Sequence, residues 1–216
     1  MPDHSTVLSR SSSSIKKIGA AGLWGGLWLA LLGVGMAAVL RYEFTAGTAG
    51  KAPGEWPVAS AVHREPGRAT LLMFAHPKCT CTQASMEELA GLIAENSSPL
   101  TVHVLFLKAE QTSDDWTQTS LWRMAAAIPG VKISLDDRGA EAARFGCETS
   151  GDVVLYDAAG RLAFHGGITS GRGHSGGSAG RAAISTLLAG NQAPRTQTPV
   201  YGCSLLNPRG ASHCLP

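Results

Sequence analysis

The chain has few charged and few aromatic residues. Lys, Arg, Asp and Glu make up 16% of its 216 residues, aromatic residues make up 6%, and the formal net charge is +2. Nucleic-acid binding through phosphate contacts needs a basic surface, so this near-neutral balance argues against a nucleic-acid partner. Five cysteines are too few for a disulfide scaffold in a chain of this length. Their positions therefore have to indicate what they do.

The sequence also lacks the motifs of several enzyme classes. It has no Ser-His-Asp set, no phosphate-binding P-loop and no zinc-finger spacing. Residues 171–176 (GRGHSG) match the glycine pattern of a dinucleotide site, but no acidic residue follows at the spacing that ribose binding needs. We therefore predict a flexible loop and no nucleotide ligand. His174 in this loop is an auxiliary candidate for the cysteine site described below.

One long uncharged run stands near the N-terminus. Residues 18–40 read IGAAGLWGGLWLALLGVGMAAVL. At about 1.5 Å per residue this run covers roughly 35 Å as a helix, against a hydrocarbon core of about 30 Å. A cleaved signal peptide is the competing interpretation, but its apolar core is usually only about 7 to 15 residues long. The run therefore predicts a single uncleaved transmembrane anchor.

The charges beside the span predict its orientation. The basic residues before it are Arg10, Lys16 and Lys17, whereas Arg41 after it is soon balanced by Glu43. Basic residues flanking a span tend to stay in the cytoplasm. We predict a cytoplasmic tail over residues 1–17, without structure, and an exported remainder. The folded domain is therefore expected on the far side of the cytoplasmic membrane.

The exported part divides by composition. Residues 41–55 are rich in Gly, Ala and Thr and predict a linker. A folded domain is expected over residues 56–190, followed by a C-terminal tail over 191–216 that contains Cys203 and Cys214. No internal repeat is visible.

Apolar patterning predicts an α/β domain with a central mixed sheet flanked by helices. Expected strands cover residues 69–75, 100–107, 131–135, 152–156 and 162–165, and expected helices cover 79–96, 120–127, 140–145 and 180–188. Wholly apolar strands such as ATLLMFA are typical of the centre of a sheet covered on both faces. The turn Asp157-Ala158-Ala159-Gly160 makes the last two strands an antiparallel hairpin.

A pair of cysteines opens the first helix of this domain. Cys79-Thr80-Cys81 follows the first strand through His76-Pro77-Lys78. A helix N-terminus and a neighbouring lysine both favour a thiolate, and a thiolate is what thiol-disulfide exchange requires. With one residue between the cysteines, their disulfide would form a small, strained ring that is easily reduced. We expect both sulfurs to be presented to a partner at the tip of the helix.

Two other interpretations of the pair stay open. In the first interpretation, Cys79 and Cys81 form a disulfide with a purely structural role. A bridge across one residue closes almost no loop, however, and contributes little stability. In the other they bind Cu(I) or zinc, together with His76 or Cys203.

Several segments resemble the thioredoxin superfamily, and most closely the RedB-type membrane-anchored, exported thioredoxin-like proteins. The segments are HPKCTCTQAS (76–85), TSLWRMAAAIPGV (119–131), RFGCETSGDVVLYDAAGRLAFHGGIT (144–169), RGH (172–174) and YGCSL (201–205). The resemblance implies a thioredoxin-like fold and a thiol-disulfide oxidoreductase that needs no cofactor and acts on protein thiols and disulfides. It also implies that Cys79 attacks and Cys81 resolves, and that the anchor lies in the inner membrane of a bacterium with the folded domain in the periplasm. The alternative is a copper-binding or copper-delivery protein of the Sco-like type.

The sequence departs from the thioredoxin pattern at two places. One residue instead of two separates the cysteines, and Thr149-Ser150-Gly151 stands where thioredoxins carry a cis-proline. That proline presents backbone to the substrate and shields the thiols from metal; Gly151 still allows close backbone approach. The auxiliary site residues predicted are His76, Lys78, Thr149, Ser150, Gly151, His174 and Cys203.

The remaining cysteines have more than one interpretation. Cys203 either pairs with Cys214 in a tail disulfide or folds back on the active pair as a third thiol or metal ligand. Cys147 is expected to be buried as a small apolar residue. His76 either tunes the thiols or caps local backbone.

Overall fold

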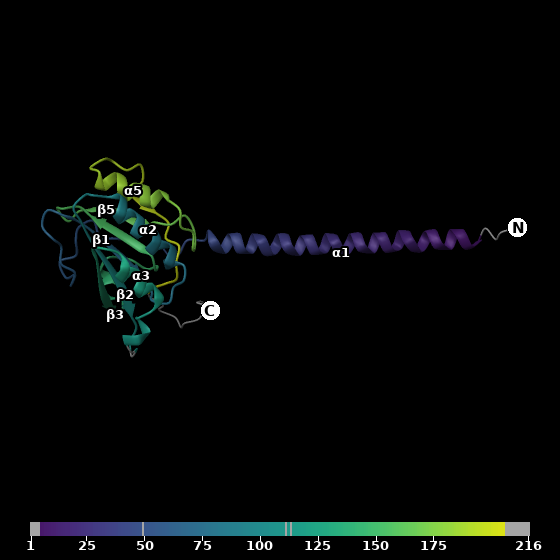
Figure 1. Cartoon of the computed structure of the whole chain (residues 1–216), viewed down its shortest axis with the longest axis horizontal. Coiled ribbons are helices and arrows are strands. Elements are labelled where there is room, and N and C mark those ends of the chain that lie inside the picture. The colour runs from purple at the N-terminus through teal and green to yellow at the C-terminus, as the bar shows by residue number, and fades with distance from the viewer. Residues whose placement is uncertain (1–4, 49, 111, 113, 206–216) are drawn as a thin grey trace. The chain divides into compact units, whose positions relative to one another are not determined.

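A computed structural model of the chain describes residues 5–48, 50–110, 112 and 114–205, and the side chains among them from residue 22 onward. The chain divides into two compact units, Met1–Tyr42 and Glu43–Pro216. The first unit is helical, and the second is an α/β domain (Figure 1).

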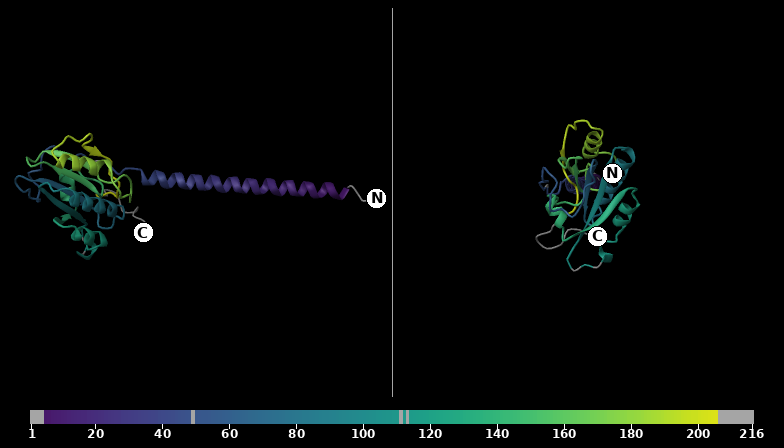
Figure 2. Two further views of the ribbon diagram at one scale, coloured as in Figure 1. Left: turned by 45° about the horizontal axis from the view of Figure 1, so that its top comes forward. Right: turned by 90° about the vertical axis from the view of Figure 1, so that its left-hand side faces the viewer.

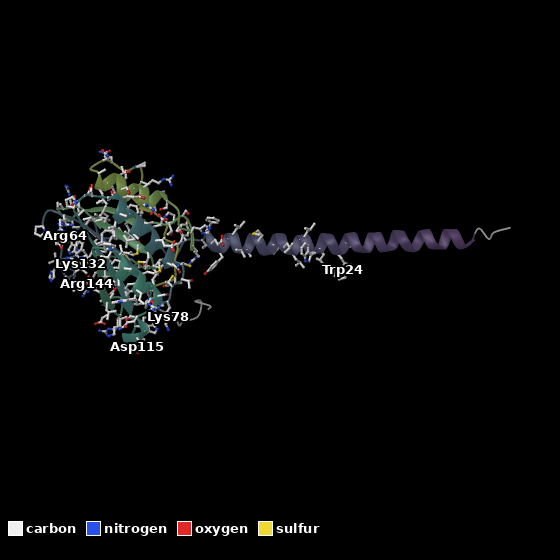
Figure 3. All side chains as sticks on the ribbon, in the orientation of Figure 1. Trp24, Arg64, Lys78, Asp115, Lys132 and Arg144 are labelled. Carbon is white, nitrogen blue, oxygen red and sulfur yellow. The ribbon has the colours of Figure 1, made fainter. Side chains whose placement is uncertain are left out.

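The N-terminal helix, α1, runs over Ser5–Glu43. Its Gly22–Glu43 part has a mean hydropathy of 2.0 and no buried residue, and Trp24 projects from it with 71% of its surface exposed (Figure 3). Its 22 residues extend about 33 Å, long enough to cross a bilayer, although a signal sequence has the same properties. Helical backbone extends from Ser5 into the predicted unstructured tail, because adding residues to an existing helix costs little.

The domain is built on one six-stranded sheet in the order β3-β2-β1-β4-β5-β6. The strands are β1 (Ala69–Ala75), β2 (Leu100–Lys108), β3 (Val131–Asp137), β4 (Asp152–Tyr156), β5 (Leu162–Gly167) and β6 (Gln197–Thr198). β1, β2 and β3 are parallel to one another, whereas β4 is antiparallel to β1 and to β5. The predicted α/β fold with a mixed sheet and a hairpin of β4 and β5 is confirmed.

Helices cover both faces of this sheet (Figure 2). The helices are α2 (Thr82–Glu95), α3 (Ser120–Ala127), α4 (Ala140–Arg144) and α5 (Ala179–Leu188), with a short 3-10 turn at Asp114–Trp116. Leu89 of α2, Ala125 of α3 and Ile184 of α5 share one apolar core with the sheet, while α4 packs on the opposite face. β1 is buried between these two cores, as its apolar sequence predicts.

Residues before Trp56 also belong to the compact domain, which begins at Glu43. Gly47 donates its N–H to the Val200 carbonyl at 2.8 Å, and the Tyr156 hydroxyl donates to the Pro53 carbonyl at 2.9 Å. The small residues that suggested a flexible linker over 41–55 instead permit close packing at two of the glycines. A side chain on Gly50 would collide with the Gly146 carbonyl, and one on Gly47 would collide with the Thr149 side chain.

Candidate redox site

The cysteine pair lies in a turn between β1 and α2. Cys79 donates its N–H to the His76 carbonyl at 3.0 Å, and Thr82 donates to the Cys79 carbonyl at 3.2 Å. Cys81 occupies the cap position, and α2 begins at Thr82, three residues later than predicted. Cys79 therefore stands just before the helix N-terminus, whose unpaired N–H groups favour a thiolate nearby.

The segment around Cys203 folds back onto this turn. Ser150 donates its N–H to the Cys203 carbonyl at 2.7 Å, and Leu205 donates to the Glu148 carbonyl at 2.8 Å. Thr149 and Ser204 form an antiparallel bridge between the same two stretches. The N–H of Cys203 donates to the Cys79 sulfur at 3.4 Å. Of the two positions considered for Cys203, the structure has it beside the active pair; Cys214 lies outside the described residues.

The three thiols interact with one another. Hydrogen bonds from Cys203 and then from Cys81, supplemented by the Thr82 hydroxyl, hold the pKa of the Cys79 thiol far below its usual range, against the opposing effect of burial. The Cys203 thiol also lowers the pKa of Cys81, but the hydrogen bond with Cys79 and burial outweigh it, so that pKa is raised. Of these two coupled thiols, Cys79 is therefore the one that loses its proton first.

The Cys79 sulfur is less accessible than the sequence predicted. Cys79 is 2% exposed, while Cys81 and Cys203 are half-buried. The folded-back Cys203 segment contacts it on one side. On another side Cys79 lines a hollow of about 280 Å³, together with Thr119 and Met124. A partner can approach from this hollow or by displacing the Cys203 segment.

The loop in the place of the cis-proline is fastened to the cysteine turn. The Ser150 hydroxyl lies 2.7 Å from the Thr82 hydroxyl and accepts the His76 N–H at 2.8 Å. Gly151 has a φ of +88°, and a side chain there would lie 2.9 Å from the Ser85 hydroxyl. Thr149, Ser150 and Gly151 thus lie beside the cysteine turn, and no described peptide bond is cis.

His76 and Lys78 both contact Trp116, which is not among the predicted site residues. The ring of Trp116 lies 5.4 Å from the His76 ring and 5.5 Å from the Lys78 ammonium nitrogen. His76 accepts the Lys78 N–H through Nδ1 at 3.2 Å, so it does cap local backbone. Burial lowers the pKa of His76, although the charge on Cys79 raises it, and the imidazole is therefore neutral near pH 7.

The loop around His174 brings an arginine to the site. Arg172 donates to the Gly202 carbonyl at 2.6 Å and also hydrogen-bonds Cys81. His174 instead packs on Phe44 at 5.7 Å, with its Nε2 4.0 Å from a Glu43 oxygen. The RGH segment (172–174) therefore places Arg172 beside the thiols. In the sequence, only the resemblance of this segment to the RedB-type proteins could have pointed to Arg172.

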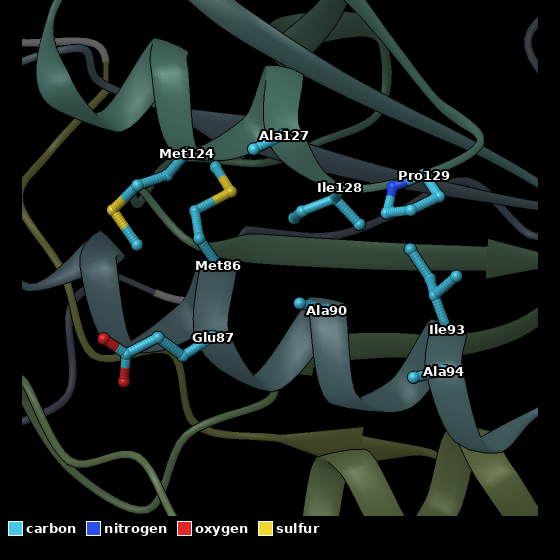
Figure 4. Close-up of a pocket in the computed structure, with 9 residues that line it drawn as sticks. All are labelled: Met86, Glu87, Ala90, Ile93, Ala94, Met124, Ala127, Ile128 and Pro129. Atoms are coloured by element: carbon cyan, nitrogen blue, oxygen red, sulfur yellow. The ribbon is translucent and has the colours of Figure 1, made fainter.

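An apolar groove adjoins the hollow beside Cys79. It lies between α2 and α3, measures about 550 Å³ and is lined mainly by small and aliphatic side chains (Figure 4). Met124 lines both the groove and the hollow. An apolar surface thus continues from the thiol site along α2.

The chain aligns with solved structures of other proteins. A hypothetical protein from Sinorhizobium meliloti 1021 aligns with a TM-score of 0.54 at 22% identity, over 76% of this chain and 96% of that one. An uncharacterized conserved protein from Geobacillus kaustophilus aligns at 0.51 and 18% identity, over 78% and 95%. A secreted Mycobacterium tuberculosis disulfide oxidoreductase, homologous to E. coli DsbE, gives 0.40 and 17% identity, over 58% and 83%. No protein-family model matches the sequence, and a search of curated proteins finds no match.

The fold is thioredoxin-like. A βαβ unit of β1, α2 and β2 carries the cysteine motif at its strand-to-helix junction, and the antiparallel β4 and β5 complete the sheet beside it. The fold that the sequence resemblance implied is confirmed at this level.

The low pKa of Cys79 predicts how stability depends on pH. A group whose pKa is depressed by folding stabilises the protein fully above its unfolded pKa, about 8.5 for cysteine, and this stabilisation is lost as pH falls toward the folded pKa. We expect the unfolding free energy of the reduced protein, relative to Cys79→Ser, to rise with pH up to about 8.5, by at most about 1.4 kcal/mol per pH unit. Urea unfolding under argon measures it; a flat difference would contradict the thiolate assignment.

Proposed function

We propose that the chain is a membrane-anchored, extracytoplasmic thiol-disulfide oxidoreductase of the RedB type. The observation that carries this proposal is the Cys79 sulfur, whose thiolate is stabilised by two neighbouring thiols. A thiolate at working pH is the reactive form in disulfide exchange, and a second thiol within reach can resolve the mixed disulfide.

The exchange begins at Cys79. Its thiolate attacks one sulfur of a client disulfide, forming a Cys79–client bond while the other client sulfur leaves as a thiolate. Cys81 then attacks the Cys79 sulfur, forming the Cys79–Cys81 disulfide and releasing the second client thiolate. Two electrons pass from the protein dithiol to the client, and the reverse sequence oxidises a client dithiol.

Cys203 adds a further step to this exchange. The Cys79–Cys81 bridge spans one residue and is expected to be strained, and the Cys203 sulfur lies beside both. Attack by the Cys203 thiolate on the Cys79 sulfur would form a Cys79–Cys203 bond and release Cys81 as a thiolate, with no net change in electrons. We expect this bridge to be the resting oxidised form.

The helix α1 supports the anchored location. Its Gly22–Glu43 part is apolar and long enough to span a bilayer, and basic residues precede it. We propose a cytoplasmic N-terminus and a periplasmic domain in a bacterium. Membrane fractionation followed by protease digestion of intact spheroplasts tests this: the domain should be digested, and protection of the domain would overturn the topology.

The activity is tested on the full chain in detergent. Reduced protein is expected to reduce insulin catalytically, or oxidised protein to reactivate scrambled ribonuclease. The direction that is faster shows whether it acts as reductant or oxidant. Absence of turnover in both directions would overturn the proposal.

Gly202 offers a test of the Cys203 segment that leaves all the cysteines in place. A side chain at Gly202 would lie 1.9 Å from the Ser150 carbonyl oxygen, so Gly202→Ala is expected to displace the segment and raise the pKa of Cys79. Gly54→Ala is the matched control, because nothing lies within 4 Å of a side chain there. Thiolate absorbance as a function of pH measures the shift, and equal titrations of the two variants would contradict the assigned role of the segment.

Carrying Cu(I) is the second candidate function. Cys203 adds a third sulfur to the predicted ligand pair, and copper(I) favours soft thiolate ligands. The His76 imidazole is less suited, because its Nδ1 accepts the Lys78 N–H. Retention of one Cu(I) by the reduced protein against a competing chelator, lost in Cys203→Ser, would favour this function over exchange; no retention would remove it.

A further inference from the structure

A second cluster of reactive side chains lies away from the redox cysteines. Cys147 follows α4, Asp152 begins β4 and His165 lies in β5. One sulfur, one carboxylate oxygen and one ring nitrogen from these residues lie within 4.8 Å of one another. Among the described residues, no other group of three or more such side chains meets this spacing.

The cluster is enclosed in the domain. Cys147 and Asp152 are 0% exposed and His165 is 5% exposed. Asp152 and His165 are brought together by the hairpin, since Val154 of β4 stands opposite His165. Cys147 is placed by its N–H bond to the Ala142 carbonyl at 2.8 Å. Three segments of chain therefore converge on one point, which no spacing in the sequence reveals.

Asp152 is incompletely satisfied at this point. One of its oxygens lies 3.2 Å from Nε2 of His165, and the other is buried without a hydrogen bond of ordinary geometry, although the Cys147 thiol and the Val153 N–H also interact with the carboxylate. A buried polar atom left unpaired costs about 1–3 kcal/mol, so such an atom in a native structure calls for a partner such as a water or an ion. A cation bound between the oxygen, the sulfur and the imidazole would supply that partner.

The donor types of the cluster fit a cation as well. A carboxylate and a thiolate enclosed in the same place need a compensating positive charge, because burying an unpaired charge is costly. A bound divalent ion would supply that charge.

The types of ligand select the ion. Zinc is bound by thiolate, imidazole and carboxylate together, whereas calcium and magnesium take oxygen ligands. His165 also lines a hollow of about 460 Å³ with Thr198 and Val200, which gives an ion and a water ligand a route to the cluster.

We propose that Cys147, Asp152 and His165 form a binding site for a divalent transition-metal ion of the zinc type, separate from the redox cysteines. Its role does not depend on the exchange chemistry at Cys79. The ion would link the segment after α4 to the β4–β5 hairpin.

Cobalt(II) titration of the full chain in detergent tests the site. The Cys79→Ser, Cys81→Ser, Cys203→Ser triple variant serves as background, so that the redox thiols cannot bind the probe. One equivalent of cobalt with a sulfur-to-cobalt charge-transfer band is expected. Asp152→Asn, which keeps the shape of the side chain, should weaken binding by at least about 100-fold, since even outer-shell partners change affinity by about 10- to 100-fold.

His103→Gln is the matched control. His103 is a partly buried histidine on β2 whose Nε2 has no hydrogen-bond partner, but it is not part of the cluster, and its variant should bind cobalt as the background does. A zinc-dependent rise in melting temperature, lost in Asp152→Asn, is expected as an independent signal. Absence of a cobalt equivalent, or binding without a charge-transfer band, would overturn the site whether or not the chain catalyses exchange.

Discussion

Replacing Cys79 with serine is expected to reduce disulfide exchange to the buffer background. The serine hydroxyl does not ionise near neutral pH and cannot form a disulfide, so the first step of the exchange is lost entirely. Cys81 cannot take its place readily, because its pKa is raised and its sulfur is mostly the neutral thiol. Insulin reduction and ribonuclease reactivation by the full chain measure the loss.

The single variants Cys81→Ser and Cys203→Ser provide the comparison. Each keeps the Cys79 sulfur and should still form a mixed disulfide with a client. The Cys81→Ser, Cys203→Ser double variant has no resolving thiol at the site, so it should accumulate this mixed disulfide, which mass spectrometry detects as an adduct on Cys79. Full activity in Cys79→Ser, or an adduct on another cysteine, would show that the nucleophile has been assigned wrongly.

Oxidation is expected to stabilise the protein strongly. A Cys79–Cys203 bridge joins residues 124 positions apart, and in the chain-entropy model a loop of that length contributes about 5 kcal/mol. For a domain of this size the melting temperature of the oxidised form should exceed that of the reduced form by roughly 10–20 °C. A Cys79–Cys81 bridge closes almost no loop and would change the melting temperature little.

Two variants separate the possible pairings of Cys203. Cys203→Ser should abolish the gain on oxidation, whereas Cys214→Ser should leave it intact. A gain that disappears in Cys214→Ser would favour the tail disulfide instead. Tryptic mapping of the oxidised chain identifies the bridge directly, and a resting Cys79–Cys81 bridge would contradict the proposed last step.

Much of the secondary structure could be predicted because its causes are local. β1 covers the predicted residues, Ala69–Ala75, since an apolar run has to be buried on both faces. α3 covers Ser120–Ala127 as predicted, because the Thr119 side chain accepts the Trp122 N–H and Pro129 follows the helix end. In each case the residues that specify the element lie within it or beside it.

Other predictions failed where composition admits two outcomes. The glycine- and alanine-rich stretch 41–55 suggested a linker, but small residues also suit a chain that packs closely on a domain. Cys79 was expected at an open helix tip, yet it is almost fully buried because Cys203 folds against it. Trp116 is not among the predicted site residues, although its ring faces both His76 and Lys78.

By itself the sequence determined the apolar N-terminal helix, the order of the first five strands and the four domain helices, and the thiol pair at the strand-to-helix junction, whereas β6 lies in the stretch predicted as a tail. These follow from periodicity, turn residues and neighbouring charge, which act over a few residues. Only the tertiary structure decided that Cys203 and Arg172 join the thiol pair, and that Cys147, Asp152 and His165 meet in the interior. Such contacts depend on which strands lie side by side in the sheet and on how the C-terminal segment packs over it, and no local pattern carries that information.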